Sequence, residues 1–119
     1  LDDLRRHHAA HAAHGGSLKT IKLGGMRPVV DAALLCEELG LKVNLACKIA
    51  ESSIATAAGL HLAAALPNVD WGVSPSSQYL ADDLVKAPCT VVAGYCEVPN
   101  APGLGVEVDE AKVARYTRT

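Results

Sequence analysis

Apolar and polar positions along the first two thirds of the chain fall into blocks that predict alternating strands and helices. Apolar runs with the length of buried strands occupy residues 17–23, 41–47 and 69–73. The intervening segments have helical periodicity and predict helices over 28–39 and 51–65, which end at Gly40 and before Pro67. Strands that alternate with helices of this length indicate βαβ units and a parallel sheet, so the predicted fold class is α/β.

The N-terminal segment, residues 2–14, is rich in alanine and histidine and predicts an exposed amphipathic helix that ends at Gly15-Gly16. His7 and His11 lie four residues apart, so both can reach one metal ion from a helix face. Few carboxylates accompany these histidines, and a solvated helix face is therefore the favoured interpretation over a metal site.

The pattern changes after Pro75, where the chain becomes loop-like with one short helical turn predicted at 78–84. Two short strands around Gly94 predict a hairpin. Asp109 follows a loop rich in proline and glycine and is predicted to cap a last helix, which continues to about Tyr116.

Composition restricts the classes of function. Half of the 119 residues are hydrophobic, only 3% are aromatic, and the formal net charge is −2. This charge does not indicate binding to a nucleic acid or to an anionic membrane. No apolar run approaches the 18 residues of a membrane span. The chain begins without a methionine, so we expect it to start inside a longer gene product.

The four cysteines are spaced too widely for a usual zinc motif. They are Cys36, Cys47, Cys89 and Cys96. Since no CxxC pair occurs, the favoured interpretation is reduced, mostly buried thiols in a cytoplasmic protein. Disulfides and metal ligands are the weaker alternatives.

Charged residues near the predicted strand ends are the candidates for chemistry. Lys19 would suit proton abstraction if desolvation or a neighbouring cation lowered its pKa, but a lysine can also simply extend to solvent at a strand end. The same alternatives apply to Lys48. Glu51 is either a carboxylate favoured by a helix dipole, beside the capping hydroxyls of Ser52 and Ser53, or a reactive carboxylate at the mouth of a barrel.

Three further features receive structural interpretations. Gly24-Gly25 is a tight turn rather than a phosphate site, because no complete glycine-rich motif surrounds it. His61 lies inside an apolar helix and is interpreted as a packed core or interface residue. Asp82-Asp83 is interpreted as a solvated turn rather than a metal pair, because no third ligand is near in the sequence.

Five segments occur in an order and spacing that resemble one known family. They are LKTIKLGG, LCEELGL, ESSIATAAGLHLAAALPN, YLADDLV and VPNAPGLGVEVDE. Together they span about Ser17 to Asp109, and they resemble the C-terminal part of the enolase superfamily in its muconate cycloisomerase (muconate-lactonizing enzyme) subgroup.

The resemblance implies part of a modified TIM (β/α) barrel with an α+β capping domain. The three predicted strands would be the sixth, seventh and eighth strands of the barrel. Residues 1–88 would form this partial barrel, with its last three strand–helix units. Residues 89–119, with the hairpin and the last helix, would return to the capping domain.

The resemblance also implies a chemistry and two catalytic residues. The family abstracts a proton α to a carboxylate and stabilises the enediolate on Mg²⁺. A lysine in a K-x-x-K-x-G-G pattern acts as acid or base, and Lys19 matches it, with Lys22 in step at a mostly solvated turn. Glu51 matches an acidic residue after the seventh strand.

The chain departs from the family where the metal should bind. The family's three carboxylate ligands end the third, fourth and fifth strands, and another catalytic lysine ends the second, but none of these strands is present. We therefore assign no metal ligand and no cofactor-binding residue here, and we expect Mg²⁺ only in the complete enzyme. The segment WGVSPSSQYL also lacks the Asp-x-Asp of the dipeptide epimerases.

The leading hypothesis is the C-terminal fragment of a muconate-cycloisomerase-like or mandelate-racemase-like enzyme that acts on a small carboxylate. The reaction would be a cycloisomerisation, a racemisation or a dehydration, and the fragment alone is expected to be inactive. The alternative is a non-catalytic truncated domain that folds through self-association. A third possibility is a subunit completed by a separate partner chain.

Overall fold

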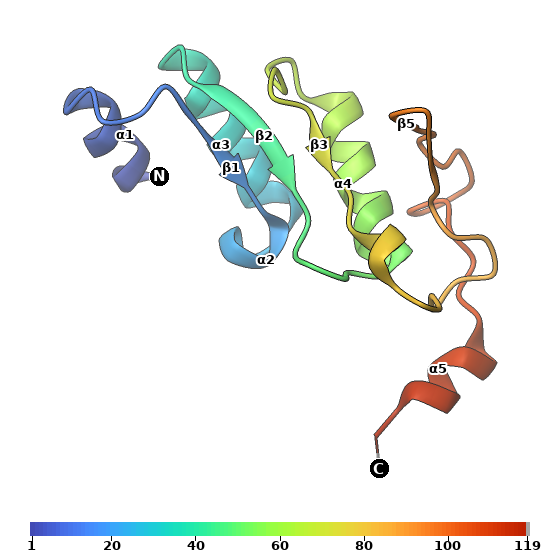
Figure 1. Cartoon of the computed structure of the whole chain (residues 1–119). Coiled ribbons are helices and arrows are strands. Elements are labelled where there is room, and N and C mark those ends of the chain that lie inside the picture. The colour runs from blue at the N-terminus through green and yellow to red at the C-terminus, as the bar shows by residue number, and fades with distance from the viewer. Residues whose placement is uncertain (119) are drawn as a thin grey trace. The chain divides into compact units, whose positions relative to one another are not determined.

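Helical segments separate the strands as far as Ser74 in the computed structural model, which describes residues 1–118 (Figure 1). The elements of this part are α1 (Asp2–Ala9), β1 (Gly15–Leu18), α2 (Thr20–Leu23), α3 (Met26–Glu38), β2 (Lys42–Ala46), α4 (Ser53–Ala65) and β3 (Val73–Ser74). The remaining elements are the 3-10 helix η1 (Ser77–Tyr79), the strands β4 (Val91–Val92) and β5 (Tyr95–Cys96), and the helix α5 (Glu110–Tyr116).

Strands β1, β2 and β3 form one parallel sheet in that order, which confirms the predicted α/β class with three parallel strands. In the register of the sheet, Ser17 pairs with Asn44 and Leu45 pairs with Val73. Parallel neighbours place their carboxyl ends at the same edge of a sheet, and this edge is where chemistry is usually found in such folds.

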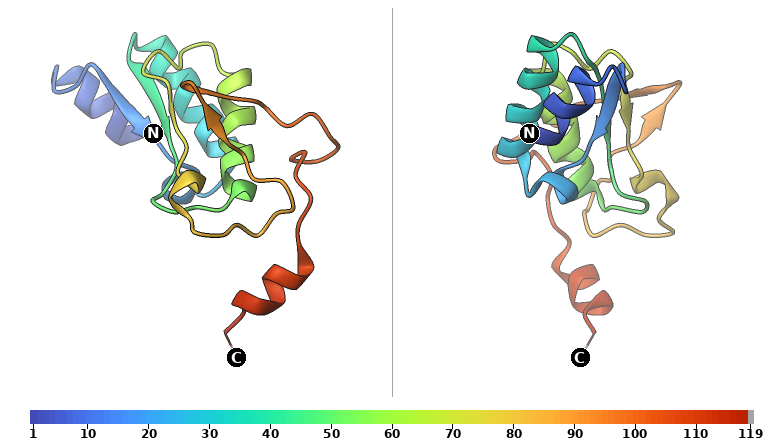
Figure 2. Two further views of the ribbon diagram at one scale, coloured as in Figure 1. Left: turned by 45° about the vertical axis from the view of Figure 1, so that its right-hand side comes forward. Right: turned by 90° about the vertical axis from the view of Figure 1, so that its left-hand side faces the viewer.

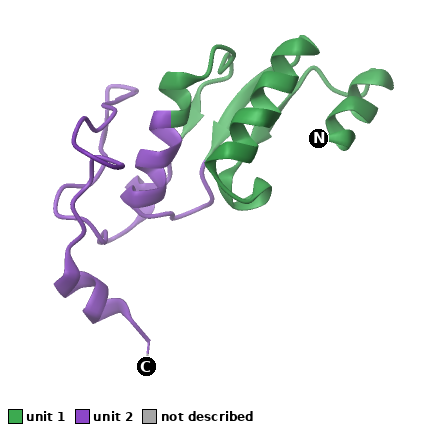
Figure 3. Cartoon of the chain, turned by 180° about the vertical axis from the view of Figure 1, so that it is seen from behind, with its two compact units in different colours: residues 1–46, 62–74 green, residues 47–61, 75–119 purple. Residues whose placement is uncertain are grey.

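The chain divides into two compact units (Figure 3). Unit 1 contains residues 1–46 and 62–74, and therefore the whole parallel sheet. Unit 2 contains residues 47–61 and the chain from Pro75 onward. The predicted division at residue 88 concerns the complete fold and stays a prediction.

The core of unit 1 lies between α3 and one face of the sheet. Figure 2 shows α3 running alongside β1 and β2. The core residues are Leu18, Val29, Ala32, Ala33, Cys36, Leu41, Val43, Leu45, Leu62 and Leu66. The alanines of α3 are fully buried, and their small side chains let the helix backbone approach the strands closely.

The strand predicted over 17–23 is wrong in its second half. Residues 20–23 form the one-turn helix α2, because the N–H groups of Lys22 and Leu23 donate to the Lys19 carbonyl. Gly24 closes this turn in the left-handed region, at φ 92°. The strand begins earlier than predicted, at Gly15, since helix α1 ends at Ala9 and not at residue 14.

The third strand is also displaced from its prediction. It was expected over 69–73, but β3 contains only Val73 and Ser74. The preceding residues form a turn in which Gly72 has a φ of 71°. A buried Asn68 donates its side-chain N–H to the Ala33 carbonyl at 2.9 Å and fixes the chain before this turn.

The C-terminal elements agree better with the sequence. The hairpin around Gly94 is confirmed, and both Ala93 and Gly94 have positive φ angles, as a tight two-residue hairpin turn requires. Asp109 caps α5 as predicted, by accepting from the N–H groups of Ala111 and Lys112. The helical turn predicted at 78–84 is instead η1 at 77–79.

Candidate functional site

Lys19 lies directly after the last residue of β1 and continues its extended backbone, with φ −135° and ψ 133°. Side chains of an extended chain alternate between the two faces of a sheet. Leu18 is buried in the core, so Lys19 shares the opposite face with Ser17. The predicted catalytic lysine therefore lies on the face of the sheet that α3 does not cover, at the carboxyl end of a strand.

That face is polar because one asparagine connects all three strands. Ser17 Oγ donates to Asn44 Oδ1 at 3.0 Å. The Asn44 amide donates to the Gly72 carbonyl at 2.9 Å and to Ser74 Oγ at 3.3 Å. Sequence reasoning missed Asn44, although an uncharged polar residue in the middle of a mostly apolar strand was the available signal.

Lys22 lies in α2 and is exposed, as expected for the second lysine of the pattern. Gly24 and Gly25 form the turn between α2 and α3, both with positive φ, which agrees with their interpretation as a tight turn. The two lysines of the pattern thus differ in setting: Lys19 is half-buried beside the sheet, and Lys22 is on the outside of a short helix.

Glu51, in unit 2, is half-buried in the loop between β2 and α4. It precedes the first residue of the helix by two positions, so it is not part of the first helical turn. Its backbone N–H donates to Ser76 Oγ at 3.3 Å and to the Lys48 carbonyl at 3.3 Å. Lys48 itself is exposed, and its carbonyl also accepts from Ser76 Oγ.

The thiol of Cys47 has a raised pKa, first because of burial and then because of the Glu51 carboxylate charge. Burial disfavours the thiolate, and a neighbouring negative charge disfavours it further. Cys47 is therefore a protonated thiol at neutral pH. No disulfide joins the four cysteines within the described residues, and of the four Cys36 is the one that is fully buried.

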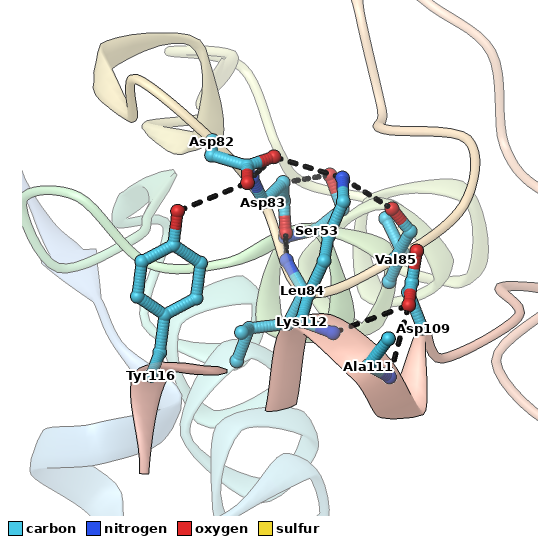
Figure 4. Close-up of polar contacts among 9 residues, drawn as sticks. All are labelled: Ser53, Asp82, Asp83, Leu84, Val85, Asp109, Ala111, Lys112 and Tyr116. Atoms are coloured by element: carbon cyan, nitrogen blue, oxygen red, sulfur yellow. Dashed lines mark hydrogen bonds and ion pairs between the residues drawn. The ribbon is translucent and has the colours of Figure 1, made fainter. Parts of the chain in front are cut away.

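Asp83 contradicts its interpretation as part of a solvated turn, because its side chain is only 4% exposed. Its two carboxylate oxygens accept from the Ser53 N–H at 3.1 and 3.0 Å, and Ser53 Oγ donates to one of them at 2.7 Å. Asp83 therefore caps the start of α4 from a distant part of the chain (Figure 4). A partner 30 positions away could not be found in the sequence pattern.

Asp82 instead contacts two residues of the C-terminal helix α5. It accepts from Tyr116 Oη at 3.0 Å and pairs with Lys112 Nζ at 2.8 Å (Figure 4). These hydrogen bonds, that from Lys112 first, lower the pKa of the Asp82 carboxyl to about 2. Both members of the acidic pair thus have structural partners within unit 2.

Within residues 1–118, no three side chains of His, Cys, Asp or Glu gather in a way that could hold a metal ion. Mg²⁺ requires several oxygen ligands in a near-octahedral arrangement, so these described residues do not fit a magnesium site by themselves. His61 was interpreted from the sequence as a packed core or interface residue. Its Nε2 lies 3.1 Å from the Leu104 carbonyl oxygen and the residue is half-buried, which fits that packing role.

In this same part of the chain, no helix is both long and apolar enough to cross a membrane. Of the two predicted catalytic residues, Lys19 belongs to unit 1 and Glu51 to unit 2. Each follows a strand of the same sheet: Lys19 comes directly after β1, and Glu51 comes five residues after the end of β2.

The family model described as "Enolase C-terminal domain-like" matches residues 1–112. A chloromuconate cycloisomerase from Pseudomonas putida is 32% identical over 117 residues, which cover 98% of this chain and 30% of that protein. Muconate cycloisomerase 1 from Rhodococcus opacus is 32% identical, over 94% of this chain and 31% of that protein. The chain thus spans about a third of the length of these curated relatives.

Solved structures agree with this match. The crystal structure of muconate cycloisomerase from Pseudomonas fluorescens superposes with a TM-score of 0.91 at 27% identity, over 99% of this chain and 33% of that one. A Pseudomonas fluorescens enolase with bound magnesium, potassium and tartrate has a TM-score of 0.85 at 26% identity, over 96% of this chain and 27% of its own. The fold is therefore the C-terminal part of the enolase-superfamily barrel, as the sequence predicted.

Proposed function

The chain belongs to the enolase C-terminal domain-like family, and from this premise we propose that it supplies the sixth and seventh strand ends of an active site that abstracts a proton α to a carboxylate. The complete enzyme would be a cycloisomerase, a racemase or a dehydratase of a small carboxylate. Its muconate and chloromuconate cycloisomerase relatives favour cycloisomerisation. The 119-residue chain alone would be inactive.

The observation that carries the proposal is the position of Lys19. Its side chain is on the polar face of the sheet, and its backbone carbonyl is held by the N–H groups of α2. A general acid or base must be held where it can reach the proton that it transfers. A lysine at a strand end, on the polar face of the sheet, meets this requirement.

Glu51 would be the second ionisable group of the site. Its main chain is fixed by Ser76 and by the turn from Lys48, while its side chain is half-buried. A carboxylate in this position can orient the substrate or exchange a proton with it. Burial first, and then the charge on Glu51, raises the pKa of the neighbouring Cys47 thiol, so the thiol does not compete as a nucleophile.

Mg²⁺ would have to be held by residues from the rest of the complete protein, because the acidic residues among the described positions 1–118 do not gather into a site. The chain's own contribution is limited to proton transfer and positioning. A role as a non-catalytic domain that is completed by self-association or by a partner chain is the second candidate. The position of β1 at the edge of the sheet, where it pairs only with β2 among the described residues, favours it.

Replacement of Lys19 tests the leading proposal in the complete protein that contains this chain. Lys19→Ala should lower turnover of a muconate or related carboxylate by roughly 10²–10⁴, the usual contribution of a positioned acid or base. Lys22→Ala is the matched control, because it removes the same side chain from the exposed helix α2, and its effect should be much smaller. Equal losses in the two variants would contradict the assignment.

A further inference from the structure

Ala50, immediately before Glu51, has a φ of 57°, in the left-handed region that a residue with a side chain rarely adopts. It occupies the third position of the turn from Lys48 to Glu51, and turns with a positive φ at that position usually have glycine there. The turn's own hydrogen bond, from the Glu51 N–H to the Lys48 carbonyl, is long at 3.3 Å. A strained residue in a turn of this kind persists only if other contacts fix it.

Ser76 provides those contacts from a distant part of unit 2. Its hydroxyl donates to the Lys48 carbonyl and accepts from the Glu51 N–H, so one oxygen atom joins both ends of the turn. Ser76 is only 5% exposed, and water therefore has little access to replace it. It also precedes η1 without capping that helix through its side chain, so the hydroxyl is committed to the turn.

We propose that Ser76 is a positioning residue for Glu51: its hydroxyl holds the strained turn from Lys48 to Glu51 and thereby sets where the Glu51 carboxylate lies. This inference rests on the proposed function, in which Glu51 belongs to the active site. Without the hydroxyl, Ala50 can relax to a negative φ, and Glu51, the next residue, is displaced with it.

Hydrogen exchange measures directly whether Ser76 holds the turn from Lys48 to Glu51. In the complete protein, Ser76→Ala should increase the exchange rate of amides in the segment 47–52 by at least tenfold. Ser77→Ala is the matched control, because Ser77 is equally buried but donates to the Cys89 carbonyl, away from the turn. Unchanged exchange in Ser76→Ala, or an equal increase in Ser77→Ala, would overturn the inference.

Steady-state kinetics separate positioning from general stability. Ser76→Ala should lower kcat by about 10-fold to 100-fold with a KM change of less than threefold, while Ser77→Ala retains the wild-type kcat. Ala50→Gly should restore part of the lost kcat in the Ser76→Ala background, because glycine adopts a positive φ without strain. A loss that Ala50→Gly does not restore would mean that Ser76 does not act through the turn.

Glu51→Gln distinguishes failure of this inference from failure of the proposed function. If Glu51 acts in the site and Ser76 acts through it, Ser76→Ala should cause little further loss of kcat in the Glu51→Gln background. A full additional loss there would overturn the inference. If Glu51→Gln leaves kcat unchanged, the proposed role of Glu51 is wrong, while the exchange measurement still decides whether Ser76 holds the turn.

Discussion

Gly15 and Gly16 are neighbours in β1 with opposite tolerance for a side chain. A Cβ at Gly15 would lie 2.2 Å from the Lys42 backbone oxygen and 2.8 Å from the Trp71 ring, whereas a Cβ at Gly16 would meet nothing within 4 Å. Because backbone cannot move aside cheaply, Gly15→Ala should lower the free energy of unfolding by about 1–3 kcal/mol, a typical cost of overpacking. Denaturant unfolding measures this loss.

Gly16→Ala is the matched control for that experiment, since it makes the same change in the same strand. Its effect should stay within about 1 kcal/mol, the range of a glycine replacement without a clash. Similar losses in the two variants would mean that the close approach of β1 to β2 at Gly15 is not what requires glycine there.

Individual residues could be predicted from the sequence when their role is local. Asp109 caps the helix that begins at the next residue, and Lys19 follows the strand that places it. Asp83 and Ser76 could not be predicted, because their partners lie more than 20 residues away. The predicted catalytic roles of Lys19 and Glu51 came from the family resemblance and stay predictions.

Helix α5 is attached through Asp82, and the pKa of this carboxyl should depend on its contact with Lys112 in the helix. The bonds from Lys112 and Tyr116 lower the pKa of Asp82 from its usual 3.8 to about 2. A lowered folded-state pKa means that this carboxylate stabilises the structure above pH 3.8, and that the contribution is lost as the pH falls through about 2. Lys112→Met removes the main cause and should raise the pKa of Asp82 toward 3.8.

An NMR titration of the Asp82 carboxyl carbon measures this shift. At pH 3 the wild-type carboxyl should remain mostly ionised, whereas a larger fraction of the Lys112→Met carboxyl should be protonated and α5 should be less protected from hydrogen exchange. Lys86→Met is a suitable control, because Lys86 pairs with Glu107 and does not touch Asp82. An unshifted pKa in Lys112→Met would show that Lys112 is not the main cause.

Helices were easier to predict than strands because the sequence signals that set helix bounds are local. Helices α3 and α4 begin and end within two residues of the predicted bounds, since apolar periodicity and glycine or proline stops are local. The apolar run at 17–23 carries no mark of where extended chain gives way to α2, which is fixed by backbone bonds to Lys19 and by Gly24. The displacement of β3 has the same origin in a turn that ends at Gly72.

At the scale of the whole molecule, the parallel sheet has two unsatisfied edges. Within residues 1–118, β1 and β3 each pair only with β2, although a barrel would give each strand two neighbours. The polar face with Asn44 is also not covered by α3, the helix against which the core side of the sheet packs. The chain spans about a third of the length of its relatives, so about two thirds of their length has no counterpart in this sequence.

The isolated 119-residue chain should therefore self-associate, because open strand edges and exposed apolar side chains favour pairing with another chain. Trp71, Val92 and Tyr95 are all at least half exposed, at 50%, 67% and 81%. Light scattering at micromolar concentration should give a mass above that of the monomer, which falls on dilution as an association equilibrium requires. The complete protein, whose added strands would pair with these edges, should not show an association that depends on them. A stable monomer mass for the isolated chain across the dilution series would contradict this prediction, and would mean that three strands are sufficient to protect their own edges.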